Sequence, residues 1–359
     1  MLHSHIDVDP APLPELWKHP PFAGEIEAPW IFGRGAFDMK SVTIAQLVAM
    51  VELKRKGLPL ERSLMLLATG DEETGSHLGT RWILREHPEL VERFWGVLTE
   101  GGAVEALEPG KVKYWGTEIW QKQLVIAEAC SDSAERLADL RRDLIDRDAS
   151  PELRRRLSPT AAAFLRAYAP SRDLQPYREM LMDPESLLRA NRWSSLPPFA
   201  SAQLVNEITV FGVHPDPSGG YGLRIVLHLL PDVELEAGWN ELLPPELLHG
   251  VEIAILFDLP PLSAASPVDH PIYAGIQRFF DTHLPGGRHG PLISPWTATD
   301  SRFFRARGIP AYGFSPFALI STDTYRMSAV DERIALPAFI DGVEVYSNLV
   351  EQLVARPSE

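Results

Sequence analysis

Short apolar runs that end in acidic residues or glycine recur in the first hundred residues of the chain. Residues 63–70 (SLMLLATG) and 94–101 (FWGVLTEG) have this pattern, which is typical of strands buried in a parallel sheet. Residues 41–56 and 76–87 carry apolar side chains at helical spacing. This alternation of strands and helices predicts a parallel α/β sheet, in which ligands bind at the carboxyl ends of the strands.

The middle of the chain has a different pattern. Residues 134–192 are rich in Arg, Leu, Asp and Ala at helical spacing and predict helices. Alternating segments at 119–127, 207–212 and 221–230 flank this region and predict strands. Together they are typical of a smaller α+β domain inserted into the first domain.

After about Leu262 the α/β pattern returns. The predicted elements are a helix near 272–283, a strand at 309–314 and a final helix at 337–354. We therefore predict an α/β fold with two domains. Residues 1–112 and 263–359 form one domain with a mainly parallel sheet, and residues 113–262 form the inserted α+β domain, with an extra helical segment at about 134–192.

Composition and charge exclude several classes of protein. The 359 residues include 34 Lys and Arg against 49 Asp and Glu, a formal charge of −15, and such an acidic surface repels nucleic-acid phosphates. A single cysteine, Cys130, excludes a disulfide framework within the chain and a Cys-rich zinc finger. No apolar run approaches the ~20 residues of a membrane span, and the first residues carry no secretory signal. We therefore expect a cytoplasmic protein that binds neither nucleic acid nor membrane.

Acidic side chains follow the predicted strands, so we expect them to meet at one edge of the sheet. Asp71, Glu72 and Glu73 are consecutive, and such crowding of negative charge raises the proton affinity of one member unless a divalent metal relieves it. One glutamate could then bind the metal while its neighbour acts as a general base. A solvated acidic turn is the alternative and explains less. The acids concerned are Asp7, Asp38, Glu72, Glu73 and Glu100.

His5 and Asp7 are two residues apart on a predicted strand, so their side chains share a face. A carboxylate there can hold the second ring nitrogen and fix the tautomer that binds a metal. A surface histidine and a turn aspartate are the simpler interpretation. Asp38 follows two glycines and could bridge two cations, although a helix N-cap is an equally common use of aspartate. The residues alone leave these alternatives open.

Six motifs in order carry a resemblance over nearly the whole chain. HSHIDVDP, IFGRGAFDMK, ATGDEETGS and LTEGG are followed by TATDSRFFRARGIPAYGFSPF and RMSAVDERI. They resemble the di-zinc aminoacylase/carboxypeptidase metallopeptidase family, whose members include acetylornithine deacetylase, succinyl-diaminopimelate desuccinylase and glutamate carboxypeptidase. The resemblance implies a zinc-peptidase-like catalytic domain and an inserted lid/dimerisation domain that pairs two subunits into a homodimer. Because only four residues precede His5, we expect the catalytic domain to be short on its N-terminal side.

The resemblance also implies roles for individual residues. His5 and Glu100 would bind one zinc ion, Glu73 would bind the second, and Asp38 would bridge both. The peptide bond between Asp38 and Met39 would be cis. Asp7 would orient His5, and Glu72 would be the general base that activates the water between the metals. The implied reaction is hydrolysis of an amide or peptide bond in a small carboxylate-bearing substrate, such as an N-acyl amino acid or a short peptide. Zinc is the implied metal, with cobalt and manganese as alternatives.

Several functional positions depart from the family pattern, among them Ser328, His228 and the run 127–131, which has no histidine where the family has one that polarises the scissile carbonyl. Ser328 stands where the family has the last histidine ligand of the second zinc. A neutral hydroxyl is a poor zinc ligand beside imidazole, so we expect the second site to bind weakly or to use a substitute. His228 stands where the family has an arginine that holds the substrate carboxylate, and it could replace that arginine in part when protonated.

Two interpretations of these departures remain. One is a working metallohydrolase with a single strong zinc site. The other is a relative that has lost activity and retains the fold for binding or for interaction with a partner. Loss of one electrostatic group on a catalytic path typically costs about 10²–10³ in rate, so several losses together would leave little activity.

Overall fold

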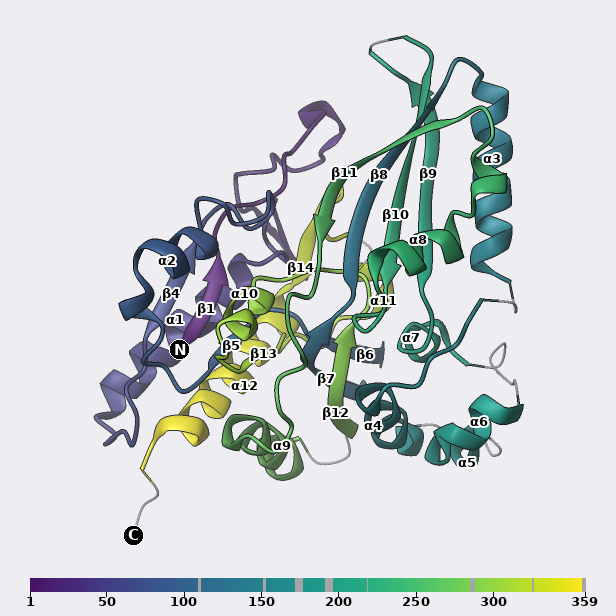
Figure 1. Cartoon of the computed structure of the whole chain (residues 1–359). Coiled ribbons are helices and arrows are strands. Elements are labelled where there is room, and N and C mark those ends of the chain that lie inside the picture. The colour runs from purple at the N-terminus through teal and green to yellow at the C-terminus, as the bar shows by residue number, and fades with distance from the viewer. Residues whose placement is uncertain are drawn as a thin grey trace. The chain divides into compact units, whose positions relative to one another are not determined.

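The computed structural model describes residues 1–108, 111–150, 153–171, 177–190, 196–217, 219–284, 288–324 and 326–356. The chain divides into two compact units (Figure 1). Unit 1 comprises Met1–Ile119, Ser263–Pro291 and Thr299–Glu359, and unit 2 comprises Trp120–Leu262 and Leu292–Ala298.

A mixed sheet of seven strands is the centre of unit 1. Strand β1 lies between β4 and β5 and is parallel to both, and β13 is parallel to β5. Strand β7 runs antiparallel to β13 and to β6. The predicted α/β fold with a mainly parallel sheet is confirmed. In the order β12-β7-β13-β5-β1-β4, the strands are Arg288–Ser294, Lys111–Gln121, Ala311–Gly313, Val97–Thr99, Leu2–His5 and Leu66–Thr69, and β6, Ala103–Glu108, pairs with β7.

Helices cover this sheet, and the bounds of α1, α9 and α12 lie within one residue of the predicted helices. Helices α1 and α12 pack against each other, and the Gln46 amide donates to the carbonyl of His3 on β1 and to the Tyr346 hydroxyl on α12. Helices α2 and α10 contribute Leu84 and Phe304 to a buried cluster with β5 and β13. The helices are α1 (Lys40–Lys56), α2 (Thr80–Glu86), α9 (Pro271–His283), α10 (Ser301–Ala306), α11 (Ser321–Thr324) and α12 (Leu336–Val354), with the 3₁₀ turns η1 (Pro14–Leu16) and η2 (Pro88–Leu90).

The helix predicted over 76–87 begins later, at Thr80. Ser76 has φ +60°, a left-handed conformation that no helix interior allows. Residues 76–79 therefore belong to the turn after β4. A separate three-stranded sheet of unit 1 joins β14 (Arg333–Ala335), β3 (Trp30–Phe32) and β2 (Ile26–Glu27), in that order.

Unit 2 contains an antiparallel sheet in the order β11-β8-β10-β9. Helix α3 (Ala134–Asp148) runs along this sheet (Figure 1) and begins at Ser133, whose hydroxyl accepts the backbone N–H of Arg136. Leu137, Leu140 and Leu144 lie on one helical face and pack in the buried core of the unit. The strands are β11 (Glu252–Leu259), β8 (Gln123–Ser131), β10 (Tyr221–Leu229) and β9 (Glu207–Pro215).

In its described part, the helical segment predicted at about 134–192 is a series of helices, and its residues 151–152, 172–176 and 191–192 lie outside the described residues. The boundary predicted at residues 112–113 falls inside strand β7, and the chain passes between the two units at residues 119–120. After α3 the helices are α4 (Pro159–Tyr168), η3 (Ala169–Ser171), α5 (Tyr177–Met182), α6 (Pro184–Ala190), α7 (Pro198–Ser201), α8 (Leu235–Leu242) and η5 (Pro245–Leu248).

Strand β11 forms one end of the unit 2 sheet and carries exposed apolar side chains. Ile255, Leu256 and Phe257 are 46%, 44% and 51% exposed. An apolar end strand is a common place for two chains to pair, and the expected homodimer stays a prediction. In the described part of the chain, no helix has both the length and the apolar character to span a membrane.

Candidate metal centre

The loops that follow β1, β4 and β5 carry four of the acids singled out in the sequence, and the fifth, Asp38, lies in the turn between β3 and α1. His5 is the last residue of β1 and pairs in register with Thr69 at the end of β4. Glu72 and Glu73 follow β4, and Glu100 comes directly after β5. Because the three strands are parallel neighbours, their carboxyl ends meet at one edge of the sheet.

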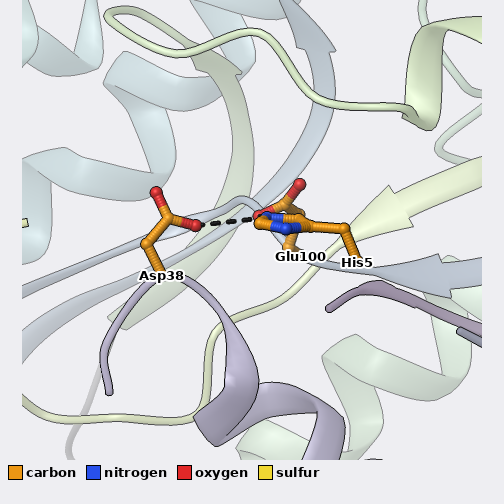
Figure 2. Close-up of side chains that lie close together, drawn as sticks. All are labelled: His5, Asp38 and Glu100. Carbon is orange, nitrogen blue, oxygen red and sulfur yellow. Dashed lines mark ion pairs between the residues drawn. The ribbon is translucent and has the colours of Figure 1, made fainter. Parts of the chain in front are cut away.

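His5, Asp38 and Glu100 come together as a compact group. The Nε2 atom of His5 lies 3.3 Å from Oδ1 of Asp38 and 3.5 Å from Oε2 of Glu100. Within this group, one ligand atom from each residue lies within 4.8 Å of the others. Figure 2 shows both carboxyl groups directed at the ring of His5. The His5 side chain is only 1% exposed, whereas the carboxyl groups remain partly accessible.

The other ring nitrogen of His5 is held by Asp7. Nδ1 lies 3.1 Å from the backbone carbonyl oxygen of Asp7, which can only accept a hydrogen bond, so Nδ1 carries the proton. With a metal bound, this arrangement would leave the lone pair of Nε2 for the ion, on the side of Asp38 and Glu100. The sequence analysis placed His5 and Asp7 on one face of a strand. Strand β1 ends at His5, however, so Asp7 lies in the following loop. The sequence predicts a contact with the Asp7 carboxylate, and its Oδ1 lies 3.4 Å from Nδ1, farther away than the backbone carbonyl oxygen.

Asp7 also connects His5 to the acidic turn. Its Oδ2 accepts the backbone N–H of Glu73 at 3.1 Å. Burial by itself would raise the pKa of Asp7, but hydrogen bonds from His5 and from the backbone of Glu72 and Glu73 hold that pKa below its usual value. Asp7 therefore stays ionised beside the imidazole.

Glu72, Glu73 and Glu100 are crowded together and half-buried. Burial raises the pKa of Glu100 to about 7, and the charge of Asp38 adds to the effect. Burial and then the charges of Asp38 and Asp9 raise the pKa of Glu73 to about 8. Burial, Glu100 and Asp300 raise the pKa of Glu72 well above its usual value. Such crowding is the electrostatic pattern that a bound divalent cation relieves.

The donor set fits a metal ion such as zinc at one position. An imidazole nitrogen and two carboxylate oxygens from separate loops are ligand types that zinc prefers. Glu73 lies beside this group rather than within it, and its Oε1 is buried without a hydrogen-bond partner among the described residues. The three-residue group thus accounts for one site, and the residues around Glu73 form a less complete one.

Two buried residues that the sequence analysis missed hold the Asp38 turn. Oε1 of Glu332 accepts the backbone N–H groups of Phe37 and Asp38 at 2.9 and 3.1 Å. Oε2 of the same residue pairs with Arg34 at 2.7 Å. The Asp38–Met39 peptide is cis, as the resemblance implies. Arg34 and Glu332 lie inside motifs quoted above, but no local pattern distinguishes them from surface charges.

Ser328 is connected to the Asp38 turn by hydrogen bonds through Arg34 and Glu332. Its carbonyl accepts Nη2 of Arg34 at 3.0 Å, and its φ of +56° places it in the left-handed region. The substitution of a hydroxyl for the expected imidazole therefore occurs next to the segment that carries Asp38. Weak binding at a second metal position stays a prediction.

His228 lies on β10 in unit 2 and is 6% exposed. Burial and the nearby charge of Lys122 lower the pKa of His228 to about 3. Its Nε2 lies 3.4 Å from the Thr209 hydroxyl. This environment favours a neutral ring that can form a hydrogen bond over a cation that pairs with a carboxylate, and a role in substrate binding stays a prediction.

Comparison with known proteins places this geometry in context. The model of peptidase family M20/M25/M40 matches residues 1–352. Aminoacylase-1A of Rattus norvegicus is 27% identical over an alignment that covers the whole chain and 80% of that relative. The di-peptidase Dug1p from Saccharomyces cerevisiae has a similar fold, with a TM-score of 0.68 and 14% identity over 98% of this chain and 79% of that one. The M20 family metallo-carboxypeptidase Sso-CP2 from Sulfolobus solfataricus has a TM-score of 0.63 and 18% identity over 98% and 84%.

Proposed function

Because this chain belongs to peptidase family M20/M25/M40, we propose that it is a zinc-dependent hydrolase of amide or peptide bonds in small carboxylate-bearing substrates. N-acyl amino acids and short peptides are the substrate classes proposed. The observation that carries the proposal is the convergence of His5 Nε2 and Glu100 Oε2, from the ends of neighbouring strands, with Asp38 Oδ1 from the turn before α1. The names of the similar proteins, an aminoacylase, a di-peptidase and a carboxypeptidase, refer to bonds of this kind.

His5, Asp38 and Glu100 would hold the metal. When bound, zinc supplies a Lewis acid that polarises a carbonyl group and makes a water molecule more acidic. The same nitrogen and oxygen donors also suit cobalt and manganese. A site with three protein ligands leaves a position open, which is the form that catalytic zinc sites take.

Glu72 is the proposed general base. Its carboxylate would take a proton from water as the water oxygen bonds to the substrate carbonyl carbon. It would return that proton to the amide nitrogen as the carbon–nitrogen bond breaks, so that an acid and an amine leave. Asp7 supports this step indirectly, because it fixes the tautomer of His5.

A second candidate is a family member without catalytic activity that uses the fold for binding. The observation that favours it is Ser328, which stands where the resemblance places a histidine ligand. The two candidates differ in whether turnover depends on Glu72 and on added metal.

The test uses the full chain stripped by a chelator and reloaded with zinc. We expect turnover of N-acetyl amino acids or dipeptides only after reloading, and Glu72→Ala should lower it by about 10²–10⁴-fold. Glu61→Ala, at an exposed glutamate of the same unit, is the matched control and should keep full activity. Bound zinc without any Glu72-dependent turnover would contradict the hydrolase proposal and favour the binding protein.

A further inference from the structure

The segment Thr299 to Ser301, at the start of α10, reaches two separate acid-bearing loops of the candidate metal centre. Thr299, Asp300 and Ser301 are 3%, 1% and 0% exposed. They lie in the TATDSRFF motif, for which the resemblance supplied no role. Three adjacent buried polar residues need partners, and their partners indicate what they do.

Asp300 holds the turn that carries Glu72 and Glu73. The hydroxyl of Ser76 donates to Oδ1 of Asp300. The N–H of Gly75 donates to the carbonyl of Glu72 at 2.9 Å, so Ser76 is at the base of the same tight turn. Ser76 adopts a left-handed conformation that is uncommon for serine. Such a conformation is unfavourable by itself and is maintained by contacts with the surrounding structure. The hydrogen bond to Asp300 is one of these contacts.

Ser301 reaches the loop that carries Glu100 through a second buried carboxylate. Its hydroxyl donates to Oε1 of Glu118 at 2.7 Å, and Arg305 pairs with the same oxygen at 3.2 Å. Glu118 is fully buried on β7. Its other oxygen, Oε2, faces Gly101, where an added Cβ atom would lie only 2.0 Å away.

The Glu100 loop is therefore packed directly on the Glu118 carboxyl group. Gly101 has φ +96° and follows Glu100 in the chain, so no larger residue fits this position without moving the loop. Gly313 on β13 packs against both residues, since an added Cβ atom there would be 2.4 Å from the Glu100 carbonyl oxygen and 2.9 Å from Oε2 of Glu118. The loop backbone has little freedom to shift.

A third contact connects Asp300 to the strand that ends in His5. Oδ2 of Asp300 lies 3.7 Å from Nε2 of His3. The His3 ring is fully buried and also contacts the hydroxyls of Thr80 and Thr99, each at 2.9 Å. Thr99 immediately precedes Glu100, so one buried polar network lies beneath all three strand ends.

We propose that Asp300 and Ser301 are positioning residues that fix the Glu72–Glu73 turn and the Glu100 loop relative to each other. Asp300 acts through Ser76, and Ser301 acts through Glu118. Neither residue is proposed to touch the substrate. The expected effect on catalysis rests on the proposed function. If the chain is a hydrolase, displacement of the base or of a metal ligand by about 1 Å can lower the reaction rate by about 10²-fold.

The test compares Ser76→Ala and Ser301→Ala with Ser266→Ala in the full chain. Ser266 is also buried in unit 1, and its hydroxyl donates to the Ala311 carbonyl at 2.7 Å. That carbonyl also accepts Arg305 at 3.3 Å, so the control loses a similar hydrogen bond in the same region but touches neither the Ser76–Asp300 nor the Ser301–Glu118 contact. Zinc affinity is measured by competition with a chromophoric chelator, kcat and KM are measured on the best substrate found, and thermal unfolding shows that each variant folds.

We expect Ser76→Ala to lower kcat by about 10- to 100-fold with KM and zinc affinity little changed, because it displaces the turn of the base. Ser301→Ala should weaken zinc binding by about 10- to 100-fold, because it loosens the loop of a ligand. Ser266→Ala should change neither. If a variant does not fold, Asp300→Asn replaces Ser76→Ala and Glu118→Gln replaces Ser301→Ala, since both amides preserve the shape of the side chain.

The results separate two kinds of failure. If Ser76→Ala has the kcat of Ser266→Ala, or if Ser301→Ala binds zinc as tightly as the unaltered chain, the positioning inference is wrong. If the unaltered chain shows no zinc-dependent turnover at all, the proposed function fails. In that case the zinc affinities of Ser301→Ala and Ser266→Ala still decide whether the Glu100 loop is held in this way.

Discussion

Two histidines, one in each unit, are buried to nearly the same extent and have opposite electrostatic surroundings. His5 is 1% exposed at the end of β1, and His228 is 6% exposed on β10. Burial lowers the proton affinity of both rings. The carboxylates of Glu100, Asp38 and Asp7 overcome this effect at His5 and raise its pKa, whereas Lys122 adds to it at His228.

The difference shows that burial alone does not indicate function. A buried imidazole needs a partner for each polar atom, and hydroxyls or backbone groups satisfy that need in most cores. His3 is an example, since threonine hydroxyls surround it and burial lowers its pKa to about 3. An imidazole whose neighbours are several carboxylates is different, because those acids repel one another and need a positive charge.

Substitution of the two histidines should give the largest difference between the units. Loss of a residue that only hydrogen-bonds to a metal ligand can weaken metal binding by up to about 100-fold. We expect His5→Ala to weaken zinc binding by more than this, because it removes a direct ligand. His228→Ala should leave zinc affinity unchanged and lower the free energy of unfolding by about 1–3 kcal/mol, because its buried neighbours lose a hydrogen-bonding group.

Chelator competition measures the zinc affinities, and urea unfolding of the zinc-free chains measures the stabilities. Equal zinc affinities for His5→Ala and His228→Ala would contradict the assignment of His5 as a ligand. The comparison would then no longer distinguish a metal-binding unit from a structural one.

Restoring a histidine at position 328 should give a smaller but specific effect. The segment of Ser328 is bound to the Asp38 turn through Arg34, so a longer side chain there starts close to the acids. We expect Ser328→His to raise tightly bound zinc from about one to about two ions per chain, because imidazole is a far better zinc ligand than a hydroxyl. Histidine is also among the residues that tolerate the left-handed backbone of this position.

Metal analysis after dialysis measures the stoichiometry, and Ser328→Ala is the matched control that should gain nothing. Two tightly bound zinc ions in the unaltered chain would show that another residue already completes the second site. In that case the second half of the centre would be as strong as the half around His5.

Much of the site could be predicted because its residues follow apolar runs. The acids after β4 and β5 stand next to strands that the sequence shows clearly, and parallel neighbours bring such positions together. The cis bond after Asp38 came from the resemblance, and the structure has it. The pairing of Asp7 with His5 came from spacing, and in the structure the backbone carbonyl of Asp7 lies nearer to the ring nitrogen than its carboxylate does.

The supporting residues could not be predicted, because their roles depend on distant partners. Glu118 and Arg305 are 187 residues apart and form a fully buried ion pair, yet each looks like a surface charge in the sequence. Likewise, Ser76 has the spacing of a helical residue and is turned out of the helix by its contact with Asp300. The pattern of apolar runs in the sequence predicts which residues lie at the ends of strands. It does not predict which distant residues hold those strand ends in place.

The smallest expected effect concerns the pH dependence of stability in unit 2. The pKa of His228 is lowered to about 3 in the folded chain from 6.5. Between these values the unfolded chain binds a proton that the folded ring does not bind, so stability is full above about pH 6.5 and falls as the pH decreases toward 3. The contribution of one such group to the slope is at most about 1.4 kcal/mol per pH unit.

His228→Gln removes this proton and should flatten the acid limb by up to that amount. His249→Gln, at an exposed histidine of the same unit, is the matched control and should keep the slope of the unaltered chain. Urea unfolding of the zinc-free chains at a series of pH values measures both, and zinc-free protein gives all three chains the same contribution from the acids of unit 1. Equal slopes for His228→Gln and His249→Gln would mean that His228 takes up a proton in the folded state. The ring of His228 would then be able to pair with a carboxylate. The two histidines would differ in where they lie in the fold but not in their ability to carry a positive charge.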